Sequence, residues 1–167
     1  NPKLELTKDI FLFLCYTGLA HSDARKATLS DIRLDNKNRP WLTLRRTKTD
    51  NLVQVPLLPI AVNIIGKYDN HKSRKYENRL LPVPCNQVLN RNLKELCQTV
   101  GISKTISSHG GRYTFASTVL LGNGVRLEVV KSLLAHDSIK STMIYSKLSS
   151  EALVTDIEAL ESRLGKI

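Results

Sequence analysis

Cysteine is scarce in this chain, and the few cysteines are scattered. The 167 residues include three, Cys15, Cys85 and Cys97, an odd number that forms no Cys-x-x-Cys pair. This pattern argues against a disulfide framework and against a zinc site built from cysteines. Cys15 and Cys97 fall in apolar stretches of helical period, so we expect both to be core residues.

Long apolar runs, a leader sequence, internal repeats and low-complexity segments are lacking too. No apolar stretch approaches the roughly 20 residues that a membrane-crossing helix needs. The N-terminal residues do not have the pattern of a signal peptide. We therefore expect a cytoplasmic protein with no membrane partner. The chain begins at Asn1 rather than methionine, which suggests a fragment of a longer protein.

Acidic residues are few relative to basic ones. Lysine and arginine number 25 against 15 aspartates and glutamates, which gives a formal charge of +10. Such an excess fits a polyanionic partner, with nucleic acid the first candidate, although a basic protein without such a partner would have the same composition. Because 41% of the residues are hydrophobic, we expect one folded globular domain.

Helical periodicity dominates the chain, and strand-like segments are confined to its middle. Apolar spacing predicts helices at 7–19, 22–29, 60–68, 86–100, 108–121, 126–134, 138–146 and 149–164. Short strands are expected at 32–34, 41–46 and 51–55, and the turn 47–50 joins the last two into a hairpin. The polar, basic segment 69–79 predicts an exposed loop. The expected fold class is therefore mainly α with a small antiparallel β-sheet (α+β).

Three short motifs in the C-terminal half carry residues suited to catalysis. His109 and Arg112 are three residues apart, so they share one face of the expected helix. His136 ends an apolar helix, and Tyr145 follows nine residues later. Each motif alone is a weak signal, because a lone histidine or tyrosine in a helix more often has a structural role.

Taken together, the motifs resemble the signature of the tyrosine recombinase, or phage integrase, family. The stretches SSHGGRYTFAS and LLAHDSIKSTMIYSKL resemble the family's His-x-x-Arg, its second histidine and its nucleophilic tyrosine at the family's spacing. TGLAHSDARKATLSDI (17–32) resembles its first box, and RRTKTDNLVQVPL (45–57) resembles its hairpin with the catalytic lysine. The resemblance covers about residues 7 to 148 and implies the tyrosine recombinase catalytic-domain fold.

The resemblance implies a role for each of five residues. Tyr145 would attack the scissile phosphorus, forming a 3′-phosphotyrosyl link and freeing a 5′-hydroxyl. Arg112 would hold the non-bridging oxygens with its planar guanidinium. His109 would accept the tyrosine proton or bond the phosphate, and His136 would donate to a non-bridging oxygen. Lys48, in the hairpin turn, would protonate the leaving 5′-oxygen, and no metal or other cofactor would be required.

One position departs from the family pattern. The first box normally reads Thr-Gly-Leu-Arg, and its arginine is the second phosphate clamp, but this chain has Ala20. Loss of such a donor commonly costs about 10²–10³ in rate. We favour replacement by Lys8 or Arg25, since integrases of conjugative transposons show similar looseness at this box. An arginine removed for structural work, a catalytically weak domain and a wrong register are the alternatives.

Further basic residues are expected to contact DNA phosphates. They lie in the hairpin and in the basic segment, at Arg45, Arg46, Lys48, Lys72, Arg74 and Lys75. Asp23 either orients a basic neighbour or is an acid favoured at a helix N-terminus. His21 and His71 are not expected to act in catalysis.

The sequence therefore predicts a site-specific DNA recombinase (integrase) that acts on double-stranded DNA during integration or excision of a mobile element. A type IB topoisomerase-like enzyme and a catalytically weakened DNA-binding relative are the alternatives. Residues 1–148 are expected to form the catalytic domain and 149–167 a C-terminal helix that is exchanged between protomers. The resemblance also implies N-terminal DNA-binding domains outside this chain, a free monomer, a tetramer on synapsed DNA, accessory DNA-bending proteins and association with the nucleoid.

Overall fold

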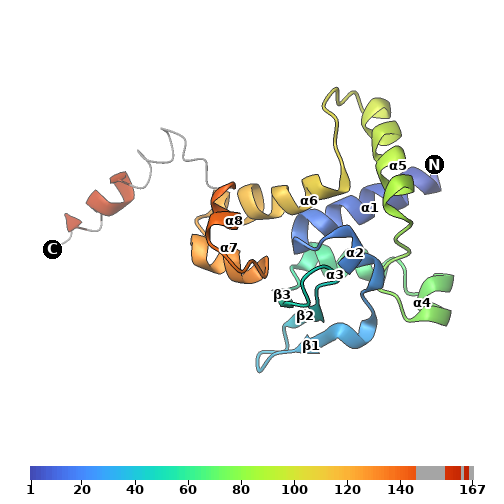
Figure 1. The fold of residues 1–167 in the computed structure, drawn as a ribbon, viewed down its shortest axis with the longest axis horizontal. Helices are drawn as coiled ribbons and strands as arrows, with labels where there is room; N and C mark the ends of the chain where they lie inside the picture. Colours follow the sequence, from blue (N-terminus) through green and yellow to red (C-terminus); the bar gives the residue numbers. More distant parts are fainter. Residues whose placement is uncertain (146–156, 163, 166–167) are drawn as a thin grey trace.

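The computed structural model describes residues 1–145, 157–162 and 164–165, which form a mostly helical fold with one small sheet at the lower edge of the view in Figure 1. The helices are α1 (Pro2–Thr17), α2 (His21–Lys26), α3 (Pro59–Gly66), α4 (Lys72–Glu77), α5 (Asn86–Thr99), α6 (Ser108–Thr114), α7 (Leu127–Leu133) and α8 (Lys140–Met143). Three short helical turns, η1 (Leu29–Asp31), η2 (Phe115–Leu120) and η3 (Leu121–Asn123), complete the named helical elements. With a three-stranded antiparallel sheet, the fold class is the expected α+β.

Helix α1 begins five residues earlier than the periodicity predicted. The side chain of Asn1 caps it by accepting a hydrogen bond from the backbone nitrogen of Lys3 at 3.1 Å. Pro2 occupies the first turn, where its missing N–H has no partner to lose. Thr7, which the sequence suggested as the start, lies inside the helix and donates to the carbonyl of Lys3.

Two glycines set the distance between α1 and α6. Gly18 ends α1 in the left-handed conformation, and a Cβ there would meet the ring of Phe115 at 2.2 Å. A Cβ on Gly111 would meet Leu14 at 2.7 Å. Only glycine fits at these two contacts, and the close packing brings the end of α1 against the helix that carries Arg112.

The sheet has the predicted strands and hairpin within one residue at each end. Its order is β1 (Ile32–Leu34), β2 (Pro40–Arg45) and β3 (Leu52–Pro56). The cross-strand pairs of β2 and β3 that face the core are buried on both strands, at Leu42 with Val55 and at Leu44 with Val53. This alternation of buried and exposed side chains fixes the register of β2 and β3. The positions of the residues that flank the turn with Lys48 are therefore also fixed.

The core draws on all parts of the chain before residue 146. Phe13, Leu14 and Phe115 are among the largest fully buried side chains. Cys15 and Cys97 are buried, as the sequence predicted, and burial raises the pKa of Cys15 to about 11. Among the helices that the structure describes, none is long and apolar enough to cross a membrane.

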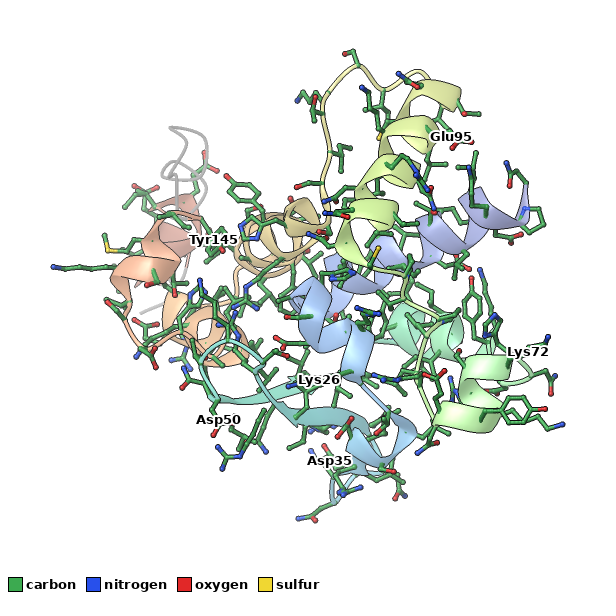
Figure 2. The ribbon with its side chains drawn as sticks, turned by 45° about the vertical axis from the view of Figure 1, so that its right-hand side comes forward. Lys26, Asp35, Asp50, Lys72, Glu95 and Tyr145 are labelled. Carbon is green, nitrogen blue, oxygen red and sulfur yellow. The ribbon has the colours of Figure 1, made fainter. Side chains whose placement is uncertain are left out.

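The expectation of an exposed loop at residues 69–79 is wrong. Residues Lys72–Glu77 form helix α4, and the guanidinium of Arg74 is buried, with two bonds to backbone carbonyls and an ion pair to Asp69 at 3.3 Å. Arg74 therefore cannot reach a DNA phosphate as predicted. The side chains of Lys72 and Lys75 are exposed, and Lys72 points outward in Figure 2.

The C-terminal helices are shorter than predicted. The expected helix at 108–121 changes after Thr114 into the π-helical turn η2, and the helix expected at 138–146 is limited to α8. Residues 22–29 form only the six-residue α2 before the chain turns into η1. Of the helix expected at 149–164, residues 157–162 are helical, whereas 149–156 and 163 lie outside the described residues.

Candidate active site

Arg112 lies at the centre of the polar interior. Its side chain, held by α6, is only 4% exposed. Nη1 donates to the carbonyl of Gly18 at 2.5 Å, and Nη2 donates to the carbonyl of Leu134 at 2.6 Å. Burial, and then the neighbouring charge of Arg46, lower the pKa of Arg112 to about 10. The guanidinium therefore stays charged at neutral pH, where it joins the end of α1 to the end of α7.

Tyr145 packs into the same interior. Its side chain is 6% exposed and lies between the end of α8 and helix α6 (Figure 2). The ring is stacked on His136, with centroids 6.2 Å apart, and meets Tyr113 edge-on at 5.4 Å. The phenol is also close enough to Arg112 to interact with its charge. Three residues that the sequence singled out, Tyr145, His136 and Arg112, thus lie together within one chain.

His136 is held in an orientation that suits a neutral hydrogen-bond donor. It follows Ala135, whose left-handed backbone (φ 48°) turns the chain after α7. Nδ1 lies 3.0 Å from the hydroxyl of Thr142, so the tautomer with hydrogen on Nε2 allows Thr142 to donate to Nδ1. Burial, then the charges of Arg112 and Arg46, lower the pKa of His136 to about 4. At neutral pH the ring is therefore uncharged.

A hollow of about 280 Å³ opens beside this cluster, at the position of the missing arginine. Its lining residues come from the first box, from the start of α5 and from α6: Leu19, Ala20, His21, Ser22, Asn86, Ser108, His109 and Arg112. His109 is exposed, one turn before Arg112 on α6. Ala20 thus faces the same space as the two polar residues of the His-x-x-Arg motif, which supports the register of the first box.

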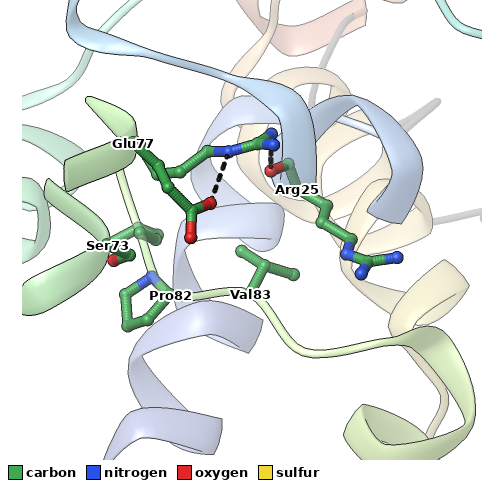
Figure 3. Close-up of a pocket in the computed structure, with 7 residues that line it drawn as sticks. Arg25, Ser73, Glu77, Pro82 and Val83 are labelled. Carbon is green, nitrogen blue, oxygen red and sulfur yellow. Dashed lines mark hydrogen bonds and ion pairs between the residues drawn. The ribbon is translucent and has the colours of Figure 1, made fainter.

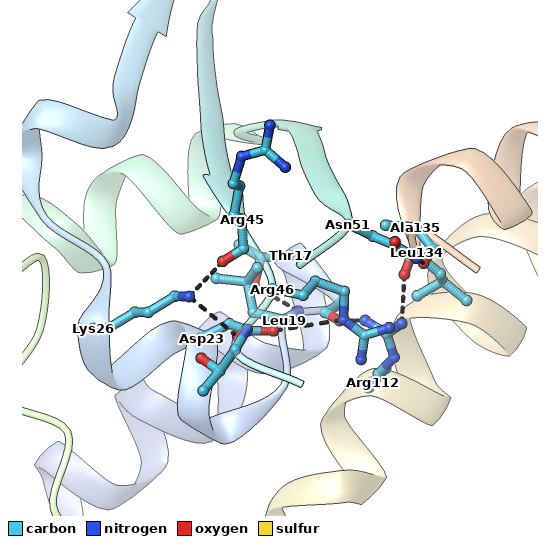
Figure 4. A network of polar contacts seen from close by, with 12 residues as sticks. Thr17, Leu19, Asp23, Lys26, Arg45, Arg46, Asn51, Arg112, Leu134 and Ala135 are labelled. Atoms are coloured by element: carbon cyan, nitrogen blue, oxygen red, sulfur yellow. Dashed lines mark hydrogen bonds and ion pairs between the residues drawn. The ribbon is translucent and has the colours of Figure 1, made fainter. Parts of the chain in front are cut away.

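A second arginine reaches the cluster from the hairpin. Arg46 follows β2, its side chain is 13% exposed, and its Nε lies 3.7 Å from the carboxylate of Asp23 (Figure 4). This Nε is buried and has no hydrogen-bond partner among the described residues. The charge of Arg46 acts on both Arg112 and His136. Two guanidinium groups with one buried carboxylate leave local positive charge, which suits a phosphate.

Comparison with protein families matches residues 2–152 to the phage integrase family. The chain belongs to this family. It is 33% identical over 156 residues to tyrosine recombinase XerD of Lacticaseibacillus casei, which covers 87% of this chain and 51% of that protein. It is 31% identical over 163 residues to tyrosine recombinase XerC of Rickettsia bellii (strain OSU 85-389), with 91% and 50% covered. This integrase chain therefore spans about half the length of the curated relatives it matches.

Solved structures share the fold of this integrase chain. The XerH site-specific recombinase bound to palindromic difH substrate has a TM-score of 0.73 at 17% identity, covering 96% of this chain and 47% of that one. The Tn1549 transposon integrase in complex with transposon right end DNA scores 0.66 at 20%, covering 91% and 58%. The catalytic domain of bacteriophage HP1 integrase scores 0.62 at 20%, covering 95% and 91%. The expected tyrosine recombinase catalytic-domain fold is confirmed.

Of the two residues expected to replace the missing first-box arginine, Lys8 lies far from the hollow at Ala20 and Arg25 lies next to it. Lys8 is ten residues before Gly18, about 15 Å along the axis of α1, and pairs with Asp9 at 3.8 Å. Arg25 lines one pocket of about 250 Å³ (Figure 3). It also lines a pocket of about 500 Å³ that shares three lining residues with the hollow. The structure therefore argues against Lys8, whereas replacement by Arg25 stays a prediction.

Asp23 organises the base of the hairpin turn in this integrase chain. Its carboxylate is buried on α2 and accepts a hydrogen bond from the backbone nitrogen of Thr47 at 2.8 Å. It also lies 3.7 Å from Arg46 and 4.0 Å from Lys26, whose ammonium donates to the carbonyl of Arg45. The structure supports both interpretations of Asp23, because this residue lies in the first turn of α2 and also orients a basic neighbour, Arg46.

Four of the predicted DNA contacts, Arg45, Lys48, Lys72 and Lys75, are on the surface. Lys48 is exposed in the turn that begins beside Arg46, and Arg45 is exposed and pairs with Asp50 at 3.2 Å. Helix α4, which carries Lys72 and Lys75, lies at the opposite end of the molecule from Tyr145 (Figure 2). Among the described residues, no group of three histidines, cysteines or carboxylates could hold a metal ion.

Sequence reasoning missed two features of this site. Arg46 was expected only to contact DNA, although its side chain lies inside the site, beside Asp23. Thr142, the hydrogen-bond partner of His136, carried no signal, because its contact depends on how α8 folds back on α7.

Proposed function

We propose that the protein containing this chain is a site-specific DNA recombinase that cuts and rejoins strands through a 3′-phosphotyrosyl link. One observation carries the proposal: Tyr145 is buried, stacked on His136 and close to the fixed guanidinium of Arg112. A phenol beside a fixed guanidinium is placed to attack a phosphate that the same guanidinium binds.

The reaction follows from the groups present. The Tyr145 oxygen attacks the scissile phosphorus while His109 accepts the phenol proton, and the bond from phosphorus to the 5′-oxygen breaks. Arg112 and neutral His136 donate hydrogen bonds to the non-bridging oxygens as negative charge develops. Lys48 gives its proton to the leaving 5′-oxygen. Attack by a 5′-hydroxyl on the phosphotyrosine reverses these steps and rejoins the strand, so no cofactor is needed to conserve the bond energy.

Arg46 fills the role of the missing first-box arginine in this proposal. Its guanidinium approaches Arg112 from the hairpin and lies beside Asp23 of α2, although Arg46 does not line the hollow at Ala20 itself (Figure 4). Asp23 orients it at 3.7 Å. A planar guanidinium in this position offers the paired donors that a phosphate requires, which supports a functional rather than a crippled active site.

Double-stranded DNA is the proposed partner. The net charge of +10 supports this choice, and relatives named as recombinases, together with a transposon integrase solved with transposon DNA, agree with it. We further propose a free monomer and a tetramer on synapsed DNA, with 149–167 exchanged between protomers. Membership of the conjugative-transposon branch, accessory DNA-bending proteins, further DNA-binding domains and nucleoid association also stay predictions.

The test is covalent capture of DNA. The chain, and any longer protein that its gene encodes, is incubated with nicked suicide duplexes of randomised sequence, and denaturant-resistant adducts are recovered and sequenced. We expect adducts on a restricted set of sequences that disappear with Tyr145→Phe. Adducts that persist with Tyr145→Phe, or wild-type protein that binds DNA without forming any adduct, would overturn the proposal.

The same material separates the two alternatives. A topoisomerase-like enzyme would relax supercoiled plasmid without exchanging strands between two sites. A non-catalytic DNA-binding relative would retain duplexes but form no adduct even when Ala20→Arg is introduced.

A further inference from the structure

Asn51 joins the hairpin to the loop that carries His136. Its Nδ2 donates to Oδ1 of Asp137 at 2.7 Å and to the carbonyl of Ala135 at 3.2 Å. Figure 4 shows Asn51 reaching from the start of β3 towards Ala135, which is 84 residues away in the chain. A single amide thus uses its two hydrogens to tie the two segments together.

Each of these segments carries a residue of the proposed reaction. The carbonyl of Asn51 accepts a hydrogen bond from the backbone nitrogen of Arg46 at 2.9 Å and closes the turn that contains Lys48. On the other side, Ala135 and Asp137 flank His136 directly. The Asn51 bridge therefore links the hairpin, which carries the proposed general acid Lys48, to the loop that carries His136.

A second hydrogen bond holds the other end of the hairpin turn. The backbone nitrogen of Thr47 donates to the buried carboxylate of Asp23 at 2.8 Å. Thr47 and Asn51 lie at the two ends of the turn. Their hydrogen bonds to Asp23 and to the Ala135–Asp137 loop therefore fix the position of the turn relative to α2 and α7. Lys48 has a long, exposed side chain with much rotamer freedom. A fixed base narrows the range of positions from which its ammonium can reach a leaving oxygen.

The loop side of the bridge needs the same support. Ala135 has φ 48°, a left-handed conformation that is unfavourable for an alanine because its Cβ approaches the following carbonyl oxygen. Its backbone nitrogen is held by the carbonyl of Ser132 at 2.9 Å, and its carbonyl by Asn51. This conformation turns His136 back onto the ring of Tyr145. Loss of the bridge would therefore loosen the hairpin and the histidine loop together.

We propose that Asn51 is a positioning residue that couples the hairpin to the His136 loop, so that Lys48 and His136 approach the scissile phosphate as one unit. The inference rests on the recombinase function proposed above. It predicts that removing the bridge impairs protonation of the leaving oxygen more than it impairs attack by Tyr145.

A pair of DNA substrates isolates that step. Both carry a selected cleavage sequence, and one has sulfur in place of the bridging 5′-oxygen at the scissile phosphate, which leaves readily as a thiolate without a proton. We expect Asn51→Ala to slow adduct formation about ten- to hundredfold more on the oxygen substrate than on the sulfur substrate, where only the looser His136 and Arg46 slow the reaction. Lys48→Ala should show the same preference. In the Lys48→Ala background, Asn51→Ala should no longer change the ratio of the two rates.

Matched variants separate positioning from folding. Gln54→Ala removes an exposed amide from the same strand and should leave both rates unchanged. Asn51→Asp places a second carboxylate against Asp137 and should be slower than Asn51→Ala. Adding Asp137→Asn exchanges donor and acceptor across the bridge, so this pair should recover part of the oxygen-substrate rate. Thermal unfolding of each variant shows whether the fold is kept.

The outcomes are distinct. Equal slowing on both substrates would mean that Asn51 only supports the fold, and no slowing would mean that the bridge is irrelevant; either result overturns the inference while the recombinase function stands. If the wild-type protein cleaves neither substrate, the recombinase function fails and the inference fails with it.

Discussion

At the scale of single residues, we propose Arg46 as the replacement for the first-box arginine that this chain lacks. Replacing it with alanine should slow adduct formation about 10²–10³-fold, because a guanidinium facing the developing charge is lost. Arg46→Lys should recover only part, since an ammonium lacks the paired donors. Adding Ala20→Arg to Arg46→Ala should restore much of the rate from the hollow beside Arg112. Single-turnover suicide cleavage measures all of these variants.

A matched arginine provides the control for this prediction. Arg33→Ala removes an exposed arginine from β1, and its cleavage rate should equal that of the wild type. If Arg46→Ala also cleaves at the wild-type rate, another group must act as the clamp. If Ala20→Arg fails to rescue, the hollow does not face the phosphate.

His136 makes the stability of the protein depend on pH. Its folded-state pKa of about 4 lies below the ordinary 6.5, so the unfolded chain binds the proton more tightly. The free energy of unfolding should therefore fall as the pH drops from about 6.5 towards 4, and the contribution should be fully present above pH 6.5. Denaturant unfolding at pH 7.5 and pH 5 measures it. In His136→Gln the difference between the two pH values should shrink; an unchanged difference would assign it to other groups.

At the scale of elements, the crossing of α1 and α6 depends on one of two adjacent glycines. Gly111→Ala would place a methyl group 2.7 Å from Leu14 and should destabilise the protein by about 1–3 kcal/mol. Gly110→Ala meets nothing closer than 3.8 Å. It should be neutral or stabilising by about 0.5–1 kcal/mol, since alanine favours helix. Urea unfolding of the two variants compares them directly, and equal effects would argue against the close crossing.

The elements were easier to predict than the roles of the residues on them. Alternation in β2 and β3 fixed the hairpin, because each strand buries one face. The burial of Arg74 could not be predicted from its basic neighbours, because it depends on two carbonyls that α3 and Leu80 present. The position of Arg46 likewise depends on where Asp23 holds the turn, which is a tertiary contact. Periodicity also could not show that α6 would change to a π-helical turn after Thr114.

At the scale of the whole molecule, the charge of +10 should govern DNA affinity. The logarithm of the association constant should fall with the logarithm of salt by about 0.9 for each phosphate neutralised. Lys72→Ala should lower that slope by about one unit. Arg74→Ala, on the same helix, should leave the slope unchanged and destabilise the fold by about 1–3 kcal/mol, because buried carbonyls lose a charged donor. Fluorescence anisotropy at several salt concentrations gives the slopes; a slope unaffected by Lys72→Ala would place α4 away from DNA.

The placement of Arg46 and Lys48 on one turn has a consequence for the timing of cleavage. In the family pattern the second clamp belongs to the segment after the first helix, so a displaced hairpin would remove only the acid. In this chain, displacement of the hairpin would move both Arg46, the proposed clamp, and Lys48, the proposed general acid, away from the phosphate. In the proposed mechanism, a DNA-bound protomer with a displaced hairpin would bind the phosphate with Arg112 alone. It would also lack the general acid, Lys48. Such a protomer would lack two groups needed for cleavage, and it could cleave only after the hairpin had returned and restored both.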